Sequence, residues 1–253
     1  MYNRTFLRLF LIVFTTFCSC YVLSGCSSST TTTTPPPNTV SPKKGSTYYY
    51  DMYRDSAGVK VAKSDTKDTA TVLADGQQLL GQSKVYTVLD GADTTYFTYA
   101  SNNDVMVYVQ TTGLTGLFQP VGDNVYHRWI TLGTSSKATG VVALHDTVVV
   151  TVPGVPLPIH ADVVVMSDYI GDENITVGSE TLVANHCRIS ATAISLDVIP
   201  GLKYTNQRDI YFVGKIGYAG KVTTNEVIPT VTALGVTGSN MGTFKVLTSY
   251  TLK

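Results

Sequence analysis

The chain has 253 residues, of which 18 are Lys or Arg, 18 are Asp or Glu, and 14% in all are charged. Recognition of a phosphate backbone needs clustered Lys and Arg, but the longest basic run is the pair Lys43 and Lys44, so we exclude a nucleic-acid partner. Thr and Val contribute 37 and 32 residues, and both types suit the pleated surface of a sheet. The composition therefore predicts an all-β fold with few or no helices.

The first residues carry a targeting signal. Arg4 and Arg8 flank the start of an apolar run over residues 9–22, a pattern typical of a secretory signal peptide. Polar residues interrupt this run, and it is shorter than the about 20 apolar residues that a membrane-spanning helix needs. The run ends in a tetrapeptide that resembles the bacterial lipobox, namely Leu23, Ser24, Gly25 and Cys26.

The lipobox resemblance implies a lipid-anchored chain. In that family a diacylglyceryl group is attached to the Cys thiol, here Cys26, and a signal peptidase cuts between Gly25 and Cys26. The acyl chains anchor the protein in a membrane of the cell envelope. Ser27 follows the anchor residue, and in a Gram-negative host this implies the outer membrane. We therefore expect residues 1–25 to be removed. The alternative is a conventional signal peptide or an uncleaved membrane anchor, with Cys26 present by chance.

The mature chain divides into a tether and a globular domain. Residues 26–45 are rich in Ser, Thr and Pro and hold no apolar run, so we interpret them as a tether behind the lipid anchor. The β-rich domain is expected over residues 46–253. A weak internal repeat, in which Asp75 and Gly76 correspond to Val177 and Gly178, leaves open two related lobes at 46–135 and 136–253.

Turn residues separate short β-rich runs along the domain. The segment from Asp55 to Gly58 predicts a hairpin, and the pairs Asp75–Gly76 and Asp90–Gly91 predict further hairpin turns. The Pro-rich residues 153–158 connect two Val-rich runs. If residue 152 faces residue 157, then His160 lies opposite Val149 on the paired strand.

Residues 175–224 resemble a pattern in uncharacterised envelope lipoproteins with curved open-barrel sheets. The matching residues include Val177, Gly178, Cys187, Ile210 to Val213, Gly214 and Gly217. These proteins broadly resemble the half-barrel lipoprotein carriers, whose concave faces bind acyl chains. The resemblance implies a curved antiparallel sheet or open half-barrel, and a β-sandwich is the alternative.

Motifs for catalysis do not assemble in the sequence. The segment from Gly238 to Gly242 has its Ser one place too early for a nucleophile elbow. Gly214, Gly217 and Gly220 match neither a dinucleotide fingerprint nor a P-loop, so we interpret them as bulges or bends. We predict no catalytic residue, no cofactor and no metal.

The histidines and the remaining cysteine are the other candidates for chemistry. His145 and Asp146 are neighbours on one strand and point to opposite faces, and His160 lies too far along the sheet to join His145, although it shares a face with Asp162. His127 and His186 have no carboxylate partner within their own strands. Cys187 is the last cysteine after processing; we interpret it as a small buried hydrophobe rather than a nucleophile.

Three functional hypotheses remain at this stage. The leading one is a non-enzymatic envelope lipoprotein that binds an apolar ligand, such as a lipid, or an envelope protein partner. The second is a structural or adhesive module that uses a Tyr-rich face formed by Tyr48, Tyr49, Tyr50 and Tyr53. The third, an envelope hydrolase, requires at least two of the five residues His127, His145, His160, Asp162 and His186 to converge. The residues that bind the ligand are not identifiable from the sequence.

Overall fold

The computed structural model describes residues 39–253, apart from 57–58, 111–118, 121–126, 152–157, 198–201, 229, 231 and 233–237. The predicted cleavage and lipidation residues, Gly25 and Cys26, lie outside the described residues, as does most of the predicted tether. One compact unit spans Pro36–Lys253. None of the described residues belongs to a helix that is long and apolar enough to cross a membrane.

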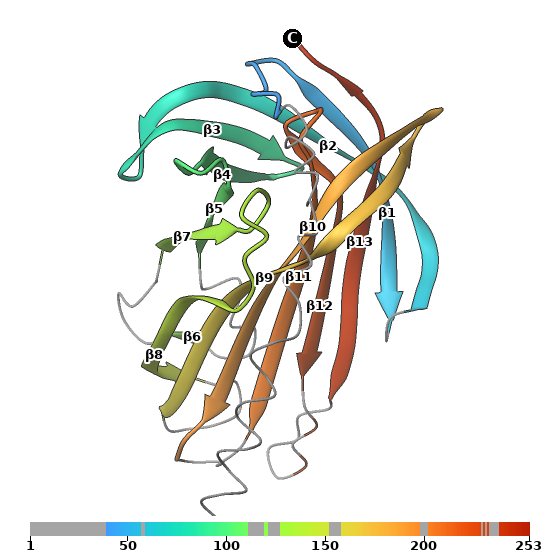
Figure 1. The fold of residues 1–253 in the computed structure, drawn as a ribbon. Helices are drawn as coiled ribbons and strands as arrows, with labels where there is room; N and C mark the ends of the chain where they lie inside the picture. The colour runs from blue at the N-terminus through green and yellow to red at the C-terminus, as the bar shows by residue number, and fades with distance from the viewer. Residues whose placement is uncertain are drawn as a thin grey trace, which may run out of the picture. The chain divides into compact units, whose positions relative to one another are not determined.

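The described part of the chain contains thirteen strands and no α-helix, which confirms the predicted all-β class. All neighbouring strands are antiparallel and belong to one sheet of order β6-β8-β9-β10-β11-β12-β13-β1-β2-β3-β4-β5-β7 (Figure 1). The strands are β1 (Thr47–Ser56), β2 (Val59–Leu79), β3 (Gln82–Asp90), β4 (Asp93–Tyr99), β5 (Val105–Gln110), β6 (Gln119–Pro120), β7 (His127–Leu132), β8 (Val141–Thr151), β9 (Ile159–Val177), β10 (Glu180–Ser195), β11 (Lys203–Val213), β12 (Tyr218–Ile228) and β13 (Ser239–Thr251).

Alternation along the strands builds the core. In β9 every second residue from Ile159 to Val165 is buried, and in β10 the same holds from Cys187 to Ala193. Successive strand residues point to opposite faces, so each strand contributes one apolar row to the inside of the sheet. The long Val- and Ala-containing strands therefore form the sheet by burying one face, as the composition predicts.

Two of the three predicted turns in the first half are confirmed. β1 and β2 pair across the segment from Asp55 to Gly58, and Gly91 adopts a φ of 63° in the turn between β3 and β4. The third prediction is wrong, because Asp75 and Gly76 lie inside β2, where the pairing with β3 shifts register. The φ of 73° at Gly76 accommodates this bulge. The hairpin turn falls instead at Leu80 and Gly81, both at positive φ.

The register of β8 and β9 matches the prediction, since Val149 lies opposite His160. The predicted bends at the later glycines are also confirmed. Gly217 has a φ of 68° in the turn that joins β11 to β12. Gly220 has no Cα partner on β11, because the register of the two strands shifts between Tyr211 and Phe212.

The sheet curls until its two ends approach each other, so that it forms an open barrel rather than a sandwich. β7, at one end of the strand order, contacts β8 and β9 near the other end. The Ser167 hydroxyl of β9 donates to the Thr131 carbonyl of β7 at 2.6 Å, and the Tyr169 amide donates to the Ala138 carbonyl at 2.9 Å. These bonds close part of the seam of the barrel.

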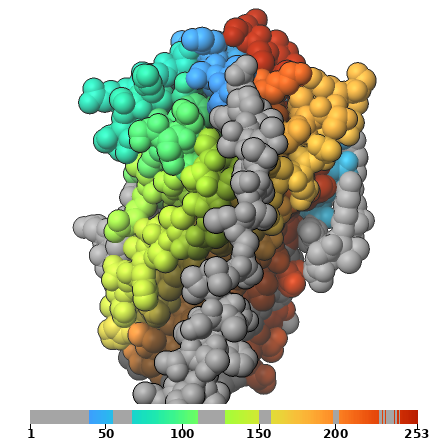
Figure 2. Space-filling model, in the orientation of Figure 1, coloured from blue at the N-terminus to red at the C-terminus, as the bar shows by residue number. Residues whose placement is uncertain are grey.

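The tip of the β9–β10 hairpin extends beyond the barrel wall and packs on its outer side. A Cβ atom on Gly220 of β12 would overlap Ile175 of this hairpin. At the tip, Glu180 accepts hydrogen bonds from Lys215, in the β11–β12 turn, and from the Tyr250 hydroxyl of β13 at 2.8 Å. Figure 2 shows these three segments gathered at one end of the molecule.

Candidate functional site

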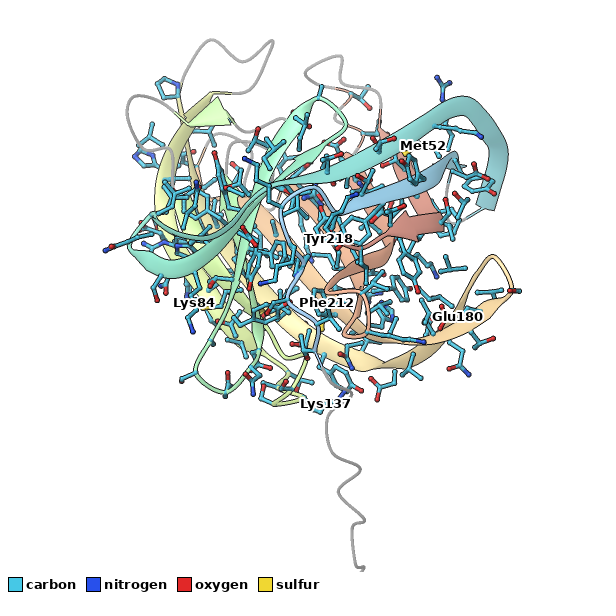
Figure 3. The ribbon with its side chains drawn as sticks, turned by 90° about the horizontal axis from the view of Figure 1, so that it is seen from above. Met52, Lys84, Lys137, Glu180, Phe212 and Tyr218 are labelled. Atoms are coloured by element: carbon cyan, nitrogen blue, oxygen red, sulfur yellow. The ribbon has the colours of Figure 1, made fainter. Side chains whose placement is uncertain are left out.

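One end of the barrel is filled by aromatic side chains. Tyr218 of β12 stacks on Tyr48 of β1 with ring centroids 4.9 Å apart, and it also contacts Phe97 of β4 at 5.8 Å. Tyr99 of β4 meets Phe212 of β11 at 6.3 Å. These contacts cross the interior and hold β4 opposite β11 and β12. Tyr218 and Phe212 accordingly lie near the middle of the ring of strands when the barrel is seen from above (Figure 3).

Residues 39–46 run across this aromatic end. The Val40 amide donates to the Gly214 carbonyl at 2.8 Å, and the Gly45 amide donates to the Val72 carbonyl at 2.8 Å. Pro42 is buried, and a Cβ on Gly217 would overlap the Val40 carbonyl oxygen. The last residues of the predicted tether therefore pack against the barrel and cover its aromatic end.

Beside this aromatic end, the inner face of the barrel lines an open cavity of about 780 Å³. Strands from both sides of the barrel line it, so the cavity exists because the sheet is curved. Its aliphatic and aromatic lining residues are Met52, Tyr96, Phe97, Val105, Val107, Tyr108, Val109, Leu132, Ile189, Ile210, Phe212, Tyr218, Ala219 and Val222. Its polar lining residues are Asp68, Asp90, Asp93, Thr94, Thr95, Arg208, Thr224, Thr243 and Lys245.

Three charged side chains in this lining form a buried ionic group. Lys245 of β13 lies 3.2 Å from Asp68 of β2 and also contacts Asp90 of β3. Burial raises the pKa of the Asp90 carboxyl above its ordinary value, and the Lys245 ammonium opposes this shift. The same ammonium lies 4.8 Å from the centre of the Tyr50 ring. Lys245 is therefore neutralised by its own neighbours.

Arg208 of β11 differs from Lys245, because no described residue forms an ion pair or a side-chain hydrogen bond with it. The register places Ile189, Arg208, Thr224 and Thr243 in one row across β10, β11, β12 and β13. All four line the cavity. Arg208 is exposed, so its guanidinium remains available at an open part of the cavity.

A second charged cluster lies on the outer face, under the β9–β10 hairpin. His186 stacks on Tyr211 with centroids 4.1 Å apart, and its Nδ1 lies 3.3 Å from Glu173. Its Nε2 lies 3.4 Å from Asp209, without hydrogen-bond geometry. Asp209 in turn accepts two hydrogen bonds from Arg188. The carboxylate partners of His186 thus come from β9 and β11 rather than from its own strand.

The other histidines predicted as candidates form separate pairs. His145 lies 3.1 Å from Asp162, so two of the five residues of the hydrolase hypothesis do come together, as an exposed pair. His160 lies 2.6 Å from Asp197, just after β10. The backbone of His127 belongs to β7, and its side chain lies outside the described part of the structure. Among the residues that the structure describes, no group of three or more His, Cys, Asp or Glu side chains could hold a metal ion.

Cys187 is buried in the barrel wall, and burial raises the pKa of its thiol to about 12. The interpretation as a small buried hydrophobe is therefore confirmed.

The side chains of the Tyr-rich segment are divided between the interior and the surface of the protein. The Tyr48 and Tyr50 hydroxyls donate to the carbonyls of Ile216 and Ala219 inside the protein, whereas Tyr49 is exposed.

No family model matches the sequence, and no curated protein matches it. Two solved structures resemble the fold. One is a "putative lipoprotein" from Parabacteroides distasonis ATCC 8503, with 12% identity over 83% of this chain and 97% of that chain and a TM-score of 0.44. The other is the hypothetical lipoprotein YmcC from Escherichia coli K12, with 11% identity over 80% of this chain and 84% of that chain and a TM-score of 0.31. At these identities and TM-scores, neither structure assigns a function to this chain.

Proposed function

We propose that this protein is a non-enzymatic, lipid-anchored lipoprotein of the cell envelope that holds an apolar or amphiphilic ligand inside its barrel. The cavity of about 780 Å³ is the observation that carries the proposal. Small-molecule sites in proteins typically occupy about 300–1,000 Å³, are mostly apolar, and contain a few polar groups that orient the ligand. The cavity matches this description in size, and aliphatic and aromatic residues form the larger part of its lining.

The distribution of polar groups supports an amphiphile. Along β11 and β12 the lining changes from the apolar pair Phe212 and Ala219 to the polar pair Arg208 and Thr224, with Thr243 beside Thr224 on β13. The aromatic end of the barrel, covered by residues 39–46, is packed. A ligand would therefore place its apolar part toward Phe212 and its polar part toward the threonines.

The anchor supports a role at a membrane surface. The lipobox that ends in Cys26 provides the attachment, and the Ser-, Thr- and Pro-rich residues that follow provide a spacer. The tether keeps the barrel and its cavity close to the membrane, whose lipids are the ligands that we propose. An envelope protein that delivers or receives this ligand is the second partner that the proposal includes.

The test fills the cavity with a side chain of the protein itself. Val222 lines the cavity, so Val222→Trp would place an indole ring where the ligand lies. Val183 is 52% exposed and does not line the cavity, so Val183→Trp is the matched control. We expect mass spectrometry of organic extracts from the purified full-length proteins to detect a non-covalent amphiphile with the parent and with Val183→Trp, and several-fold less with Val222→Trp. A parent protein without any bound amphiphile, or equal amounts in all three proteins, would refute the proposal.

A further inference from the structure

We infer that the cavity selects amphiphiles with an anionic headgroup and that Arg208 binds this headgroup. The inference rests on the proposed function, because it specifies the chemistry of the ligand for the same cavity. Its basis is the contrast between the two cations of the lining. Lys245 is engaged by Asp68 and Asp90, whereas Arg208 has no partner among the described residues.

The position of Arg208 on β11 fits a headgroup site at the end of an apolar stripe. Side chains at every second position of a strand share one face, so Arg208, Ile210 and Phe212 follow each other along the inner face of β11. Phe212 lies about 13 Å from Arg208 along the strand. An alkyl chain extended along β11 from Arg208 would contact Ile210 and end beside Phe212, at the aromatic end of the barrel.

Hydroxyl groups next to Arg208 complete the site. Thr224 lies directly opposite Arg208 on β12, and Thr243 lies opposite Thr224 on β13, so that both are within about 10 Å of Arg208 across the sheet. Their Oγ1 atoms lie 2.7 Å apart. A guanidinium offers a planar fork of donors that suits carboxylate and phosphate oxygens, and a neighbouring hydroxyl can add a further donor.

The acidic residues of the lining do not neutralise the charge of Arg208. Asp68 and Asp90 already share the Lys245 ammonium, and burial raises the pKa of Asp90. Asp93 is exposed on β4 and forms no ion pair with Arg208 in the described part of the structure. Glu226 lies two positions from Thr224 on the same face of β12, but it accepts a hydrogen bond from the Tyr204 hydroxyl at 2.8 Å. No described carboxylate therefore pairs with the Arg208 guanidinium. A cationic amphiphile would instead select the side of Asp93.

The experiment compares headgroups on one alkyl chain. Full-length protein in a nonionic detergent is irradiated with diazirine-bearing hexadecanoate, hexadecyl phosphate, hexadecanol or hexadecylamine, each below saturation, and the labelled peptides are quantified by mass spectrometry. We expect both anionic probes to label β5 and β11 about fivefold more than the alcohol. This ratio corresponds to the about 1 kcal/mol that a partly exposed ion pair contributes.

Variants assign the selectivity to Arg208. Arg208→Gln should reduce labelling by the anionic probes to the level of the alcohol, and Arg208→Lys should retain most of the preference. Lys203 lies on the same strand at an odd position, hence on the opposite face, so Lys203→Gln removes the same charge without touching the cavity. We expect this control to behave like the parent.

Several outcomes would overturn the inference. They are equal labelling by the acid and the alcohol, stronger labelling by the amine, an equal loss in Lys203→Gln, and complete competition by excess inorganic phosphate, which would indicate a site for free anions. In these cases the proposed ligand cavity survives as long as the probes label its lining. If no probe labels the lining residues, the proposed function fails together with the inference.

Discussion

The group formed by Lys245, Asp68 and Asp90 leads to a prediction about stability. All three side chains are largely buried, with exposures of 12%, 16% and 18%. Lys245→Met keeps a long apolar side chain over the Tyr50 ring but leaves two carboxylates side by side without their cation. Removing one partner of a buried ion pair typically costs about 3–5 kcal/mol. Because these side chains keep some contact with water, we expect a loss of about 3 kcal/mol at pH 7.

The same reasoning fixes the pH dependence. Burial already raises the pKa of Asp90 in the parent, and removal of the Lys245 ammonium, which opposes this shift, raises it further in the folded state. A carboxyl whose folded pKa lies above its unfolded value binds more protons in the folded state, so its unfavourable contribution decreases as the pH falls toward the unfolded value of about 4. The deficit of Lys245→Met should therefore be smaller at pH 5 than at pH 7.

The assay is urea denaturation followed by the fluorescence of Trp129, the single tryptophan, whose indole donates to the Leu80 carbonyl. Lys67→Met removes an exposed charge next to Asp68 and should change the free energy of unfolding by less than about 0.5 kcal/mol. Adding Asp90→Asn to Lys245→Met should restore part of the loss. An equal deficit at pH 5 and pH 7, together with no rescue by Asp90→Asn, would show that the cost is one of packing rather than of charge.

Two further predictions concern the fold and the anchor. Gly220→Ala should lower the free energy of unfolding by about 1–3 kcal/mol, because the added Cβ overlaps Ile175 and contacts Val213. Gly171→Ala should be nearly neutral, because no atom lies within 4 Å of the added Cβ. Equal losses for the two variants in urea denaturation would contradict this explanation. Cys26→Ala should leave an unprocessed precursor or release the protein from the membrane fraction, and unchanged processing and membrane extraction on immunoblots would refute lipidation at this residue.

Local features of the fold were predictable from the sequence because they depend on neighbouring residues. Alternating apolar residues identified the buried strands, and the short connection between β8 and β9 set the pairing of Val149 with His160. The error at Asp75 and Gly76 has a physical reason. A hairpin turn and a bulge both need a residue at positive φ, and only the partner strand decides which of them forms.

The candidate site was not predictable, because its residues are brought together by closure of the sheet. Lys245 and Asp68 are separated by 177 positions, and Lys245 and Asp90 by 155. The sequence of β13 contains no pattern that would indicate that Lys245 faces inward and contacts two carboxylates. Arg208 carried no local signal either, since a charged residue on a strand usually faces solvent. The carboxylates around His186 were missed for the same reason, as they come from adjacent strands.

Irregularities of the sheet, rather than the number of its strands, place the cavity. The pairing shifts between His186 and Cys187 on β10, between Tyr211 and Phe212 on β11, and between Tyr49 and Tyr50 on β1. His186 pairs with Tyr211, so these shifts fall at about one level of the barrel. Bulges bend a strand and increase its twist.

On one side of that level the β9–β10 hairpin turns outward and packs on the wall, while aromatic rings fill the interior. On the other side, described residues from both sides of the barrel line the cavity. The bulges therefore lie near the border between the packed aromatic end and the cavity that we propose as the ligand site.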